Sequence, residues 1–329
     1  MATYLVTGGA GFIGSHVVDE LRSRGERVRV VDSLVTGRRE NLAHAPEVEL
    51  MVGDLGDADV VDRATRDIDY VVHLAAIPSV PRSIDEPVAT NHANVTGTLG
   101  LFVAAERHGV KRVVFASSSS IYGDSAALPK REDMPADPLS PYALQKLMGE
   151  QYARLFLRLH GLETVSVRYF NVFGPRQDPS SPYSGVISLF ARCLAEQRAP
   201  IIYGDGEQTR DFTYVQNVVD GTLRACTATD VAGRVINVSC GDRVSLNTLY
   251  QLMRERAGGG PDPEFAPARV GDVRDSQADI ALARELLGYR PFVALEEGLA
   301  RTMAWYLSLI HISEPTRRTP ISYAVFCLK

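Results

Sequence analysis

The sequence predicts an α/β protein with a doubly wound parallel sheet and a smaller C-terminal α/β domain. Short β-rich runs alternate with helical patterns from residue 4 to residue 169. A glycine-rich turn at residues 8–14 separates the first strand from the first helix. After residue 170 proline becomes denser and the alternation loosens. We therefore expect one domain over residues 1–170 and a second over 171–306, with short strands such as 234–238 able to return to the first sheet.

Composition limits the classes of function. The 329 residues include 45% hydrophobic side chains, enough for a large core, and carry a formal net charge of −5. No run of Lys and Arg suggests a nucleic-acid or membrane-surface partner. The chain enters a strand pattern without a signal peptide, and no apolar run reaches membrane-spanning length, so we expect a cytoplasmic protein. The four cysteines are scattered, and we expect no metal site.

The first strand, turn and helix have the pattern of a dinucleotide phosphate site. Residues 4–7 form the strand, and the helix runs to residue 24. Gly8 allows a tight turn, Gly11 lets a pyrophosphate approach the backbone, and Gly14 allows the helix to pack closely. The start of the helix, at Phe12 and Ile13, supplies amide donors to the phosphates.

The second strand, residues 27–31, ends at Asp32. An acidic side chain at this distance from the glycine turn can bind the hydroxyls of the adenosine ribose, which favours NAD over NADP. Arg38 and Arg39 follow closely, and either can serve a 2′-phosphate instead. The sequence favours NAD and leaves NADP open.

Two further strands, residues 48–52 and 70–74, bring more residues to the same edge of the sheet. The carboxyl ends of parallel strands form the ligand crevice of such a sheet. We expect Asp54 and Leu55 to flank the adenine. We expect Leu74, Ala75 and Ala76 to let the cofactor lie against the backbone.

The pair Tyr142 and Lys146 is the predicted centre of the chemistry. Ser140 and Pro141 predict the start of a helix over residues 142–160, which places the pair one turn apart on one face. A cation beside a phenol favours the phenolate, so this spacing predicts a base that works near neutral pH. A helix over 91–108 and a strand over 112–116 precede four serines at 117–120, whose hydroxyls can bond a substrate hydroxyl and the phenol.

These motifs together resemble those of the extended short-chain dehydrogenases/reductases, which have a Rossmann-type sheet. Within that superfamily the chain resembles the nucleotide-sugar 4-epimerases. The resemblance runs from Thr3 to Tyr306 and rests on residues 7–14, 32–38, 117–123, 142–146, 169–171, 208–211 and 269–272.

The resemblance implies a role for each matching residue. Ser118 is the hydroxyl partner of the catalytic Tyr142, and Lys146 binds the nicotinamide ribose and tunes the phenol. The other matching residues are Tyr169 near the nicotinamide, Asn171, Arg210 and Arg269 at the UDP diphosphate, Tyr203 against uracil, Asp272 at the nucleotide ribose, and Ser119 among the serines that bond the substrate.

The implied activity is the 4-epimerisation of UDP-glucose and UDP-galactose by a homodimer with bound NAD, through a 4-keto intermediate. Ser276 stands where some relatives specialised for unmodified hexoses have a tyrosine. We therefore expect UDP-N-acetylglucosamine and UDP-N-acetylgalactosamine to fit as well. Ser276 can alternatively face solvent or cap the helix that starts near Asp279.

Other activities remain open. A 4,6-dehydratase uses an Asp-Glu pair directly after the residue that matches Ser118, and a UDP-glucuronate decarboxylase has an acidic residue there. This chain has Ser119 and Ser120 at those positions, which argues against both. A regulator that binds NAD without turnover would be expected to lack Tyr142 or Lys146, and the chain has both.

The last residues, 307–329, break the helical pattern of residues 295–306. They resemble an in-frame translation of a sequencing-transposon adapter. We therefore interpret them as a non-native tail and leave them out of the fold prediction.

Overall fold

A computed structural model of the chain describes residues 1–178, 185–268 and 273–313. Its centre is a sheet in which, over the described residues, seven strands pair in the order β11-β6-β5-β4-β1-β2-β3. All of their pairings are parallel. The strands are β1 (Thr3–Thr7), β2 (Arg27–Asp32), β3 (Glu49–Val52), β4 (Tyr70–His73), β5 (Arg112–Ser118), β6 (Glu163–Tyr169) and β11 (Val235–Val238). The order reverses beside β1, which confirms the doubly wound, Rossmann-type fold.

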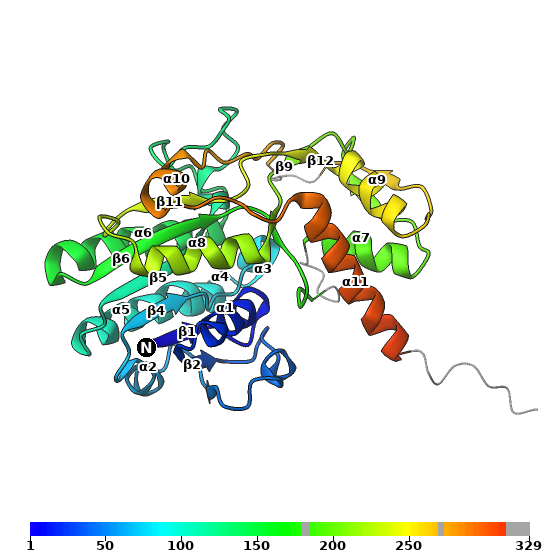
Figure 1. Cartoon of the computed structure of the whole chain (residues 1–329). Coiled ribbons are helices and arrows are strands. Elements are labelled where there is room, and N and C mark those ends of the chain that lie inside the picture. Colours follow the sequence, from blue (N-terminus) through cyan, green and yellow to red (C-terminus); the bar gives the residue numbers. More distant parts are fainter. Residues whose placement is uncertain (179–184, 269–272, 314–329) are drawn as a thin grey trace, which may run out of the picture.

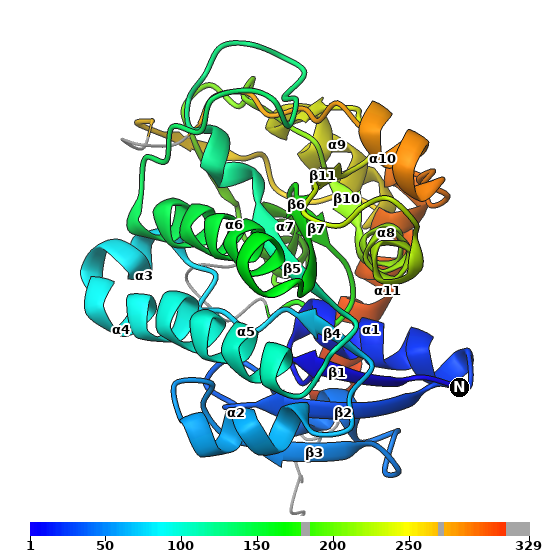
Figure 2. The ribbon, with the colours of Figure 1, turned by 90° about the vertical axis from the view of Figure 1, so that its left-hand side faces the viewer.

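Helices cover both faces of this sheet (Figure 1). One face carries α2 (Ala58–Thr65), α5 (Gly97–Arg107) and α6 (Pro141–His160), and the other carries α1 (Phe12–Ser23), α8 (Val215–Thr227) and α10 (Ala281–Leu287). Figure 2 shows the two layers from the side, with α3 (Val80–Asp85) and α4 (Pro87–Asn91) extending the first. Short helical turns lie at Arg39–Leu42 and Ser119–Tyr122.

The two-sided burial explains the sequence of the strands. Side chains alternate across a strand, so a strand covered on both faces is apolar throughout. In β1, Val6 packs in the core on the α1 and α8 side, and Leu5 packs on the α2 and α5 side. In β5, Val114 likewise packs on the α1 and α8 side, and Phe115 packs on the α2 and α5 side.

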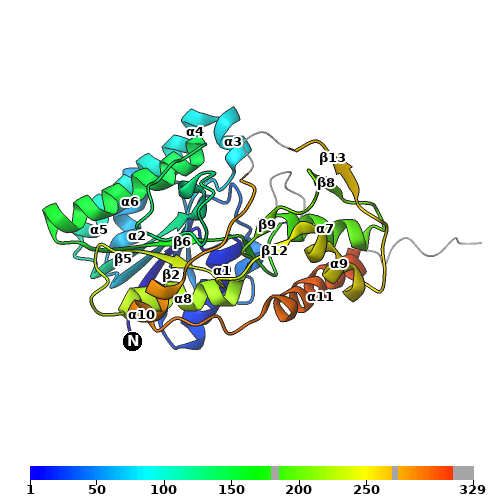
Figure 3. The same cartoon turned by 90° about the horizontal axis from the view of Figure 1, so that it is seen from above.

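A smaller lobe stands beside the sheet (Figure 3). It contains α7 (Val186–Ala195), α9 (Leu246–Arg256) and α11 (Leu295–Ser313), with β8 (Ile201–Tyr203) paired to β13 (Glu264–Ala266). Two more short pairs are β7 (Val172–Phe173) with β10 (Thr213–Tyr214), which is parallel, and β9 (Thr209–Arg210) with β12 (Val244–Ser245), which is antiparallel. The strand expected at residues 234–238 returns to the main sheet as β11.

Three local predictions differ from the structure. The helix expected over 91–108 is divided into α4, a π-helical turn at His92–Thr96, and α5. Strand β5 continues to Ser118, so the first two serines belong to the strand. Helix α11 continues to Ser313 and does not stop at residue 306, because residues 307–313 contain no Pro or Gly to end it. The origin of the tail stays a prediction.

Candidate active site

The glycine turn between β1 and α1 is packed tightly. Gly8 has a φ of 70°, a conformation that glycine adopts without strain, and its amide donates to Val31 O at 2.8 Å. A Cβ at Gly14 would lie 2.1 Å from the carbonyl oxygen of Gly8, so only glycine lets α1 approach the turn. Gly11 would bring a Cβ to 3.1 Å from the same oxygen. The turn and the start of α1 thus form an open cradle of backbone.

A cavity of about 240 Å³ lies over this cradle at the carboxyl ends of the strands. Every residue that the sequence assigned to cofactor binding lines it. They are Gly8, Gly11, Phe12, Ile13, Gly14, Asp32, Asp54, Leu55, Leu74, Ala75, Ala76, Tyr142, Lys146 and Tyr169. The topology therefore brings the three predicted groups, from the glycine turn, the strand ends and α6, to one space.

Further residues of this cavity were not predicted from the sequence. They are Val31, Ser33, Val35, Thr36, Gly53, Ile77, Pro78, Ala93 and Ala116, whereas Ser117, which also lines the cavity, belongs to the predicted run of four serines. Most lie within four residues along the chain of a position that the sequence assigned to the site, so their proximity in sequence is the signal that could have identified them. Ala93 carries no such signal, because only the packing of the π-helical turn brings it there.

Asp32 holds the glycine turn as well as lining the cavity. Its carboxylate accepts from the amides of Ala10 at 3.0 Å and Leu34 at 2.8 Å, and the residue is only 7% exposed. Nearby, Arg38 forms an ion pair with Asp178, with Nη2 and Oδ2 2.5 Å apart. One of the two arginines that could serve a 2′-phosphate, Arg38, is therefore paired with a carboxylate that follows β7 in the chain.

Tyr142 and Lys146 lie where α6 passes the end of β5. Ser140 caps the helix by accepting from Ala143 N, and Pro141 opens it, as the sequence predicts. Lys146 Nζ donates to Ala116 O at 2.7 Å and lies 5.9 Å from the centre of the Tyr142 ring. The i, i+4 spacing thus directs both side chains into the cavity.

Burial determines the direction of the pKa shift of Tyr142, and its work as a base near neutral pH stays a prediction. Burial raises the pKa of Tyr142 to about 12, and a hydrogen bond from Ser118 opposes this only in part. Burial also lowers the pKa of Lys146 to about 8. Loss of hydration raises the pKa of the phenol and lowers that of the ammonium, because both charged forms are disfavoured in the same buried place.

The serines after β5 form a small hydroxyl cluster. Ser120 Oγ donates to Ser118 Oγ at 2.9 Å, and the amide of Ser120 donates to the same oxygen at 3.2 Å. Ser118 is the member that bonds Tyr142. The cluster can pass a proton between hydroxyls, but it contains no carboxyl group.

A buried polar chain beneath the cavity escaped sequence analysis. Thr98 Oγ1 donates to Asn94 O at 2.7 Å, so it accepts from His73 Nε2 at 2.9 Å, and His73 Nδ1 accepts from Thr7 Oγ1 at 2.7 Å. Asn94 also accepts from the amide of Ile77, which lines the cavity. Burial lowers the pKa of His73 to about 3, so the ring stays neutral. His73 is a structural group, and no motif marks it.

Those predicted substrate residues that the structure describes do not line this cavity. Arg210 Nη1 donates to the carbonyl oxygens of Thr209 and Arg274 at 2.9 and 2.8 Å, and the amide of Ser276 donates to Thr209 O at 3.1 Å. The segment of Ser276 therefore runs beside β9, which carries Arg210. Asn171 has a φ of 23° and donates to Asp211 O, Tyr203 ends β8, and Ser119 opens the turn after β5. Arg269 and Asp272 lie outside the described residues.

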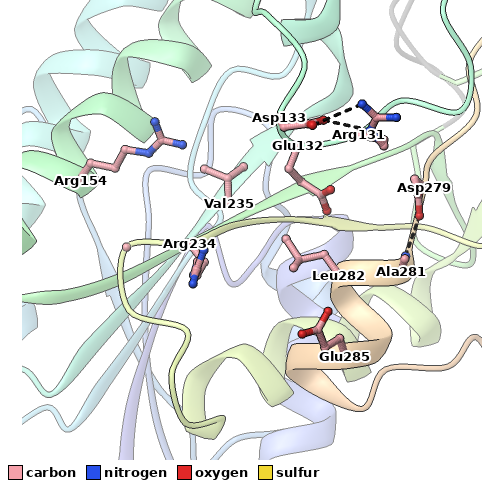
Figure 4. Close-up of a pocket in the computed structure, with 11 residues that line it drawn as sticks. Arg131, Glu132, Asp133, Arg154, Arg234, Val235, Asp279, Ala281, Leu282 and Glu285 are labelled. Carbon is pink, nitrogen blue, oxygen red and sulfur yellow. Dashed lines mark hydrogen bonds and ion pairs between the residues drawn. The ribbon is translucent and has the colours of Figure 1, made fainter.

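A second hollow, of about 510 Å³, lies at the edge strand β11 (Figure 4). It is lined by Arg131, Glu132, Asp133, Arg154, Gly233, Arg234, Val235, Asp279, Ala281, Leu282 and Glu285. It contains none of the predicted site residues. In the described part of the chain no group of three or more His, Cys, Asp or Glu side chains could hold a metal ion. None of the described helices is both long and apolar enough to cross a bilayer.

The fold and the cavity define a class of protein. A glycine turn after β1, an acidic residue after β2 and a Tyr-x-x-x-Lys pair in one cavity are the combination of a short-chain dehydrogenase/reductase. Residues 4–239 match the profile of the NAD dependent epimerase/dehydratase family, and the chain belongs to this family.

Several proteins that are similar to this chain over most of its length are named as UDP-sugar 4-epimerases. A UDP-glucose 4-epimerase of Mycolicibacterium smegmatis is 42% identical over 307 residues, which cover 92% of this chain and 97% of the relative. A solved UDP-N-acetylglucosamine 4-epimerase from Methanobrevibacter ruminantium, in complex with UDP-N-acetylmuramic acid, is 38% identical with a TM-score of 0.90, covering 94% and 99% of the two chains. A Thermus thermophilus UDP-glucose 4-epimerase in complex with NAD is 36% identical with a TM-score of 0.85, covering 92% and 98%.

Proposed function

We propose that this protein is an NAD-dependent 4-epimerase of UDP-hexoses. The observation that carries the proposal is the meeting of Tyr142 and Lys146 with the glycine turn and Asp32 in one cavity. Membership of the family and the similarity to named UDP-sugar 4-epimerases support it.

The residues present fit NAD. The space above Gly11 and the amides at the start of α1 suit a pyrophosphate, because a helix N-terminus attracts anions. Asp32 would take the adenosine ribose, with Asp54 and Leu55 beside the adenine. Lys146 would hold the nicotinamide ribose, and Tyr169 would pack near the nicotinamide. The pairing of Arg38 with Asp178 supports NAD over NADP.

In the proposed mechanism Tyr142 Oη takes the proton from the sugar 4′-hydroxyl and later returns it. NAD, held by the residues named above, would supply a positive charge that favours the phenolate and a reversible hydride acceptor for C4′, so that the hydride could return to the opposite face of the same carbon. Ser118 hydrogen-bonds the phenol and orients it toward the hydroxyl. Because the 4-keto sugar must turn over between the two steps, the protein should hold the UDP firmly and the hexose loosely.

The nucleotide would be held by the smaller lobe and the strand ends next to it. Arg210 and Arg269 would bind the diphosphate with Asn171, Tyr203 would lie against uracil, and Asp272 would reach the ribose. Charged, bidentate arginine contacts suit a diphosphate. Ser118 and Ser119 would bond the hexose.

Ser276 would determine which hexoses fit. A serine leaves room for a 2′-N-acetyl group that a tyrosine at this position would exclude, so the proposed substrates include UDP-N-acetylglucosamine and UDP-N-acetylgalactosamine. In Ser276→Tyr we expect the N-acetylated pair to lose turnover relative to the UDP-glucose pair. Equal use of both pairs by wild type and variant would show that Ser276 is not the gate.

The proposal also includes a cytoplasmic homodimer. Exposed apolar side chains lie on α4, α5 and α6, which form the outer layer on one side of the sheet (Figure 2). They are Val88, Val103, Leu144, Leu155 and Leu159. Burying such a face between two copies would remove apolar surface from water. Measurement of the mass in solution tests this part separately.

Dehydration or decarboxylation would require a carboxyl group after Ser118, and Ser119 and Ser120 provide none. A non-catalytic NAD-binding protein remains the alternative of another class. The deciding experiment incubates the purified protein with UDP-glucose, UDP-N-acetylglucosamine and UDP-glucuronate and separates the products by 4′ configuration. We expect 4-epimers without net release of NADH. Loss of water, loss of carbon dioxide or an absence of turnover would each select one of the alternatives.

A further inference from the structure

Three inward-facing side chains of α6 contact three consecutive residues at the end of β5. Lys146 donates to Ala116 O, and Tyr142 is bonded by Ser118. One turn beyond Lys146, Glu150 Oε1 accepts from Ser117 Oγ at 2.6 Å. The positions 142, 146 and 150 follow the i, i+4 spacing of one helix face, so helix and strand are fixed in register at three points.

Glu150 is held rigidly in turn. It is 1% exposed and forms a double hydrogen bond with Arg168 of β6, from Nε to Oε1 and from Nη2 to Oε2, each at 2.8 Å. Arg168 is itself 4% exposed, and its guanidinium lies 4.6 Å from the centre of the Tyr122 ring. A bidentate pair in this setting has one geometry, because rotation of either group would leave a buried charge without its partner.

Stability alone does not explain this pair. Two charges buried together gain little over apolar side chains of the same size, because both must lose their hydration. The pair does, however, hold Glu150 Oε1 in place, and this oxygen accepts the hydrogen bond from the hydroxyl of Ser117. Ser117 is 3% exposed, lines the cofactor cavity and directly precedes Ser118.

We propose that Glu150, held by Arg168, is a positioning residue that sets the end of β5 against α6 and so aligns Ser118 and Ala116 O with Tyr142 and Lys146. This inference rests on the proposed 4-epimerase function. A displacement of the strand end would move the hydrogen-bond partners of both catalytic side chains at once. A misplacement of about 1 Å in such a site can cost ~10²-fold in rate.

The test compares Glu150→Gln, Ser117→Ala and the double variant. Both single variants should lower kcat ~10- to 100-fold, with KM for the UDP-sugar changed by less than about twofold and with normal NAD content. Since Glu150 acts through Ser117, the double variant should be no slower than the slower single variant. If Glu150→Gln does not fold, Ser117→Ala alone still tests the bond to the strand end.

Thr164→Val is the matched control. Thr164 of β6 donates from Oγ1 to Ala153 O of α6 at 2.8 Å, which is also a buried bond between the sheet and α6 but lies farther along the helix. We expect the melting temperature of this variant to fall by about as much as that of Ser117→Ala, and its kcat to stay at the wild-type value. Unchanged kcat in Ser117→Ala, or an equal loss in Thr164→Val, would overturn the inference. If the wild-type protein forms no 4-epimer from any UDP-sugar, the proposed function fails instead, and that result is seen before any variant is made.

Discussion

The neutral state of His73 predicts a specific loss of stability in acid. The ring is 1% exposed and fills the space between Thr7 and Thr98. Burial, with a smaller contribution from the charge of Lys146, lowers its pKa from 6.5 to about 3. The folded protein therefore binds fewer protons at this site than the unfolded chain does. The contribution of the neutral His73 ring to the free energy of unfolding is complete above pH 6.5 and is lost as the pH falls toward 3.

The size of the effect follows from the two pKa values. Each pH unit below 6.5 costs about 1.4 kcal/mol until the folded-state pKa is approached, so His73 should lower the free energy of unfolding by about 3 kcal/mol between pH 7 and pH 4. Protonation would also place a second N–H on the ring, facing Thr7 Oγ1, and the hydroxyl hydrogen of Thr7 would lose its acceptor.

Urea unfolding at pH 7, 5 and 4 measures this effect in wild type and in His73→Gln. The variant cannot titrate at this position, so its stability should fall by about 3 kcal/mol less over the same range. His160→Gln, at the exposed end of α6, is the control and should retain the wild-type pH dependence. If His73→Gln loses as much stability as wild type between pH 7 and pH 4, the buried neutral imidazole is not the cause.

Three further predictions concern the cavity. Tyr142→Phe should keep NAD, because the ring still packs, and should lose turnover by ~10²- to 10⁴-fold, because the transferable proton is gone. Activity within tenfold of wild type would contradict the assignment of Tyr142 as the base. Gly14→Ala should lose bound NAD and have a lower melting temperature, because its Cβ would lie 2.1 Å from Gly8 O. Gly100→Ala in α5 is the control and should keep its NAD content, because the nearest atom to its Cβ would be 3.7 Å away. Asp178→Asn should tighten NADP binding, because it releases Arg38 from its ion pair. Titration of wild type and variant with NADP and with NAD measures the two affinities. An unchanged NADP affinity would show that the ion pair does not set the preference for NAD.

Local patterns in the sequence determined the fold class and most of the cofactor site. The glycine turn, Asp32 and the strand ends can be predicted because turn chemistry and strand periodicity depend on a few neighbouring residues. The carboxyl ends of parallel strands must meet at one edge, so the assigned residues from six segments line one cavity. The spacing of Tyr142 and Lys146 was likewise enough to place both on one face of α6.

Contacts between distant segments were decided only by the tertiary structure. No spacing in the sequence pairs Glu150 with Arg168, Arg38 with Asp178, or His73 with Thr98, and the return of β11 to the edge of the main sheet depends on packing against β6. The pKa of Tyr142 shows the reason. The sequence supplied the nearby cation, but the sign of the shift depends on how completely the folded chain removes water from the phenol, and that burial comes from residues far away along the chain.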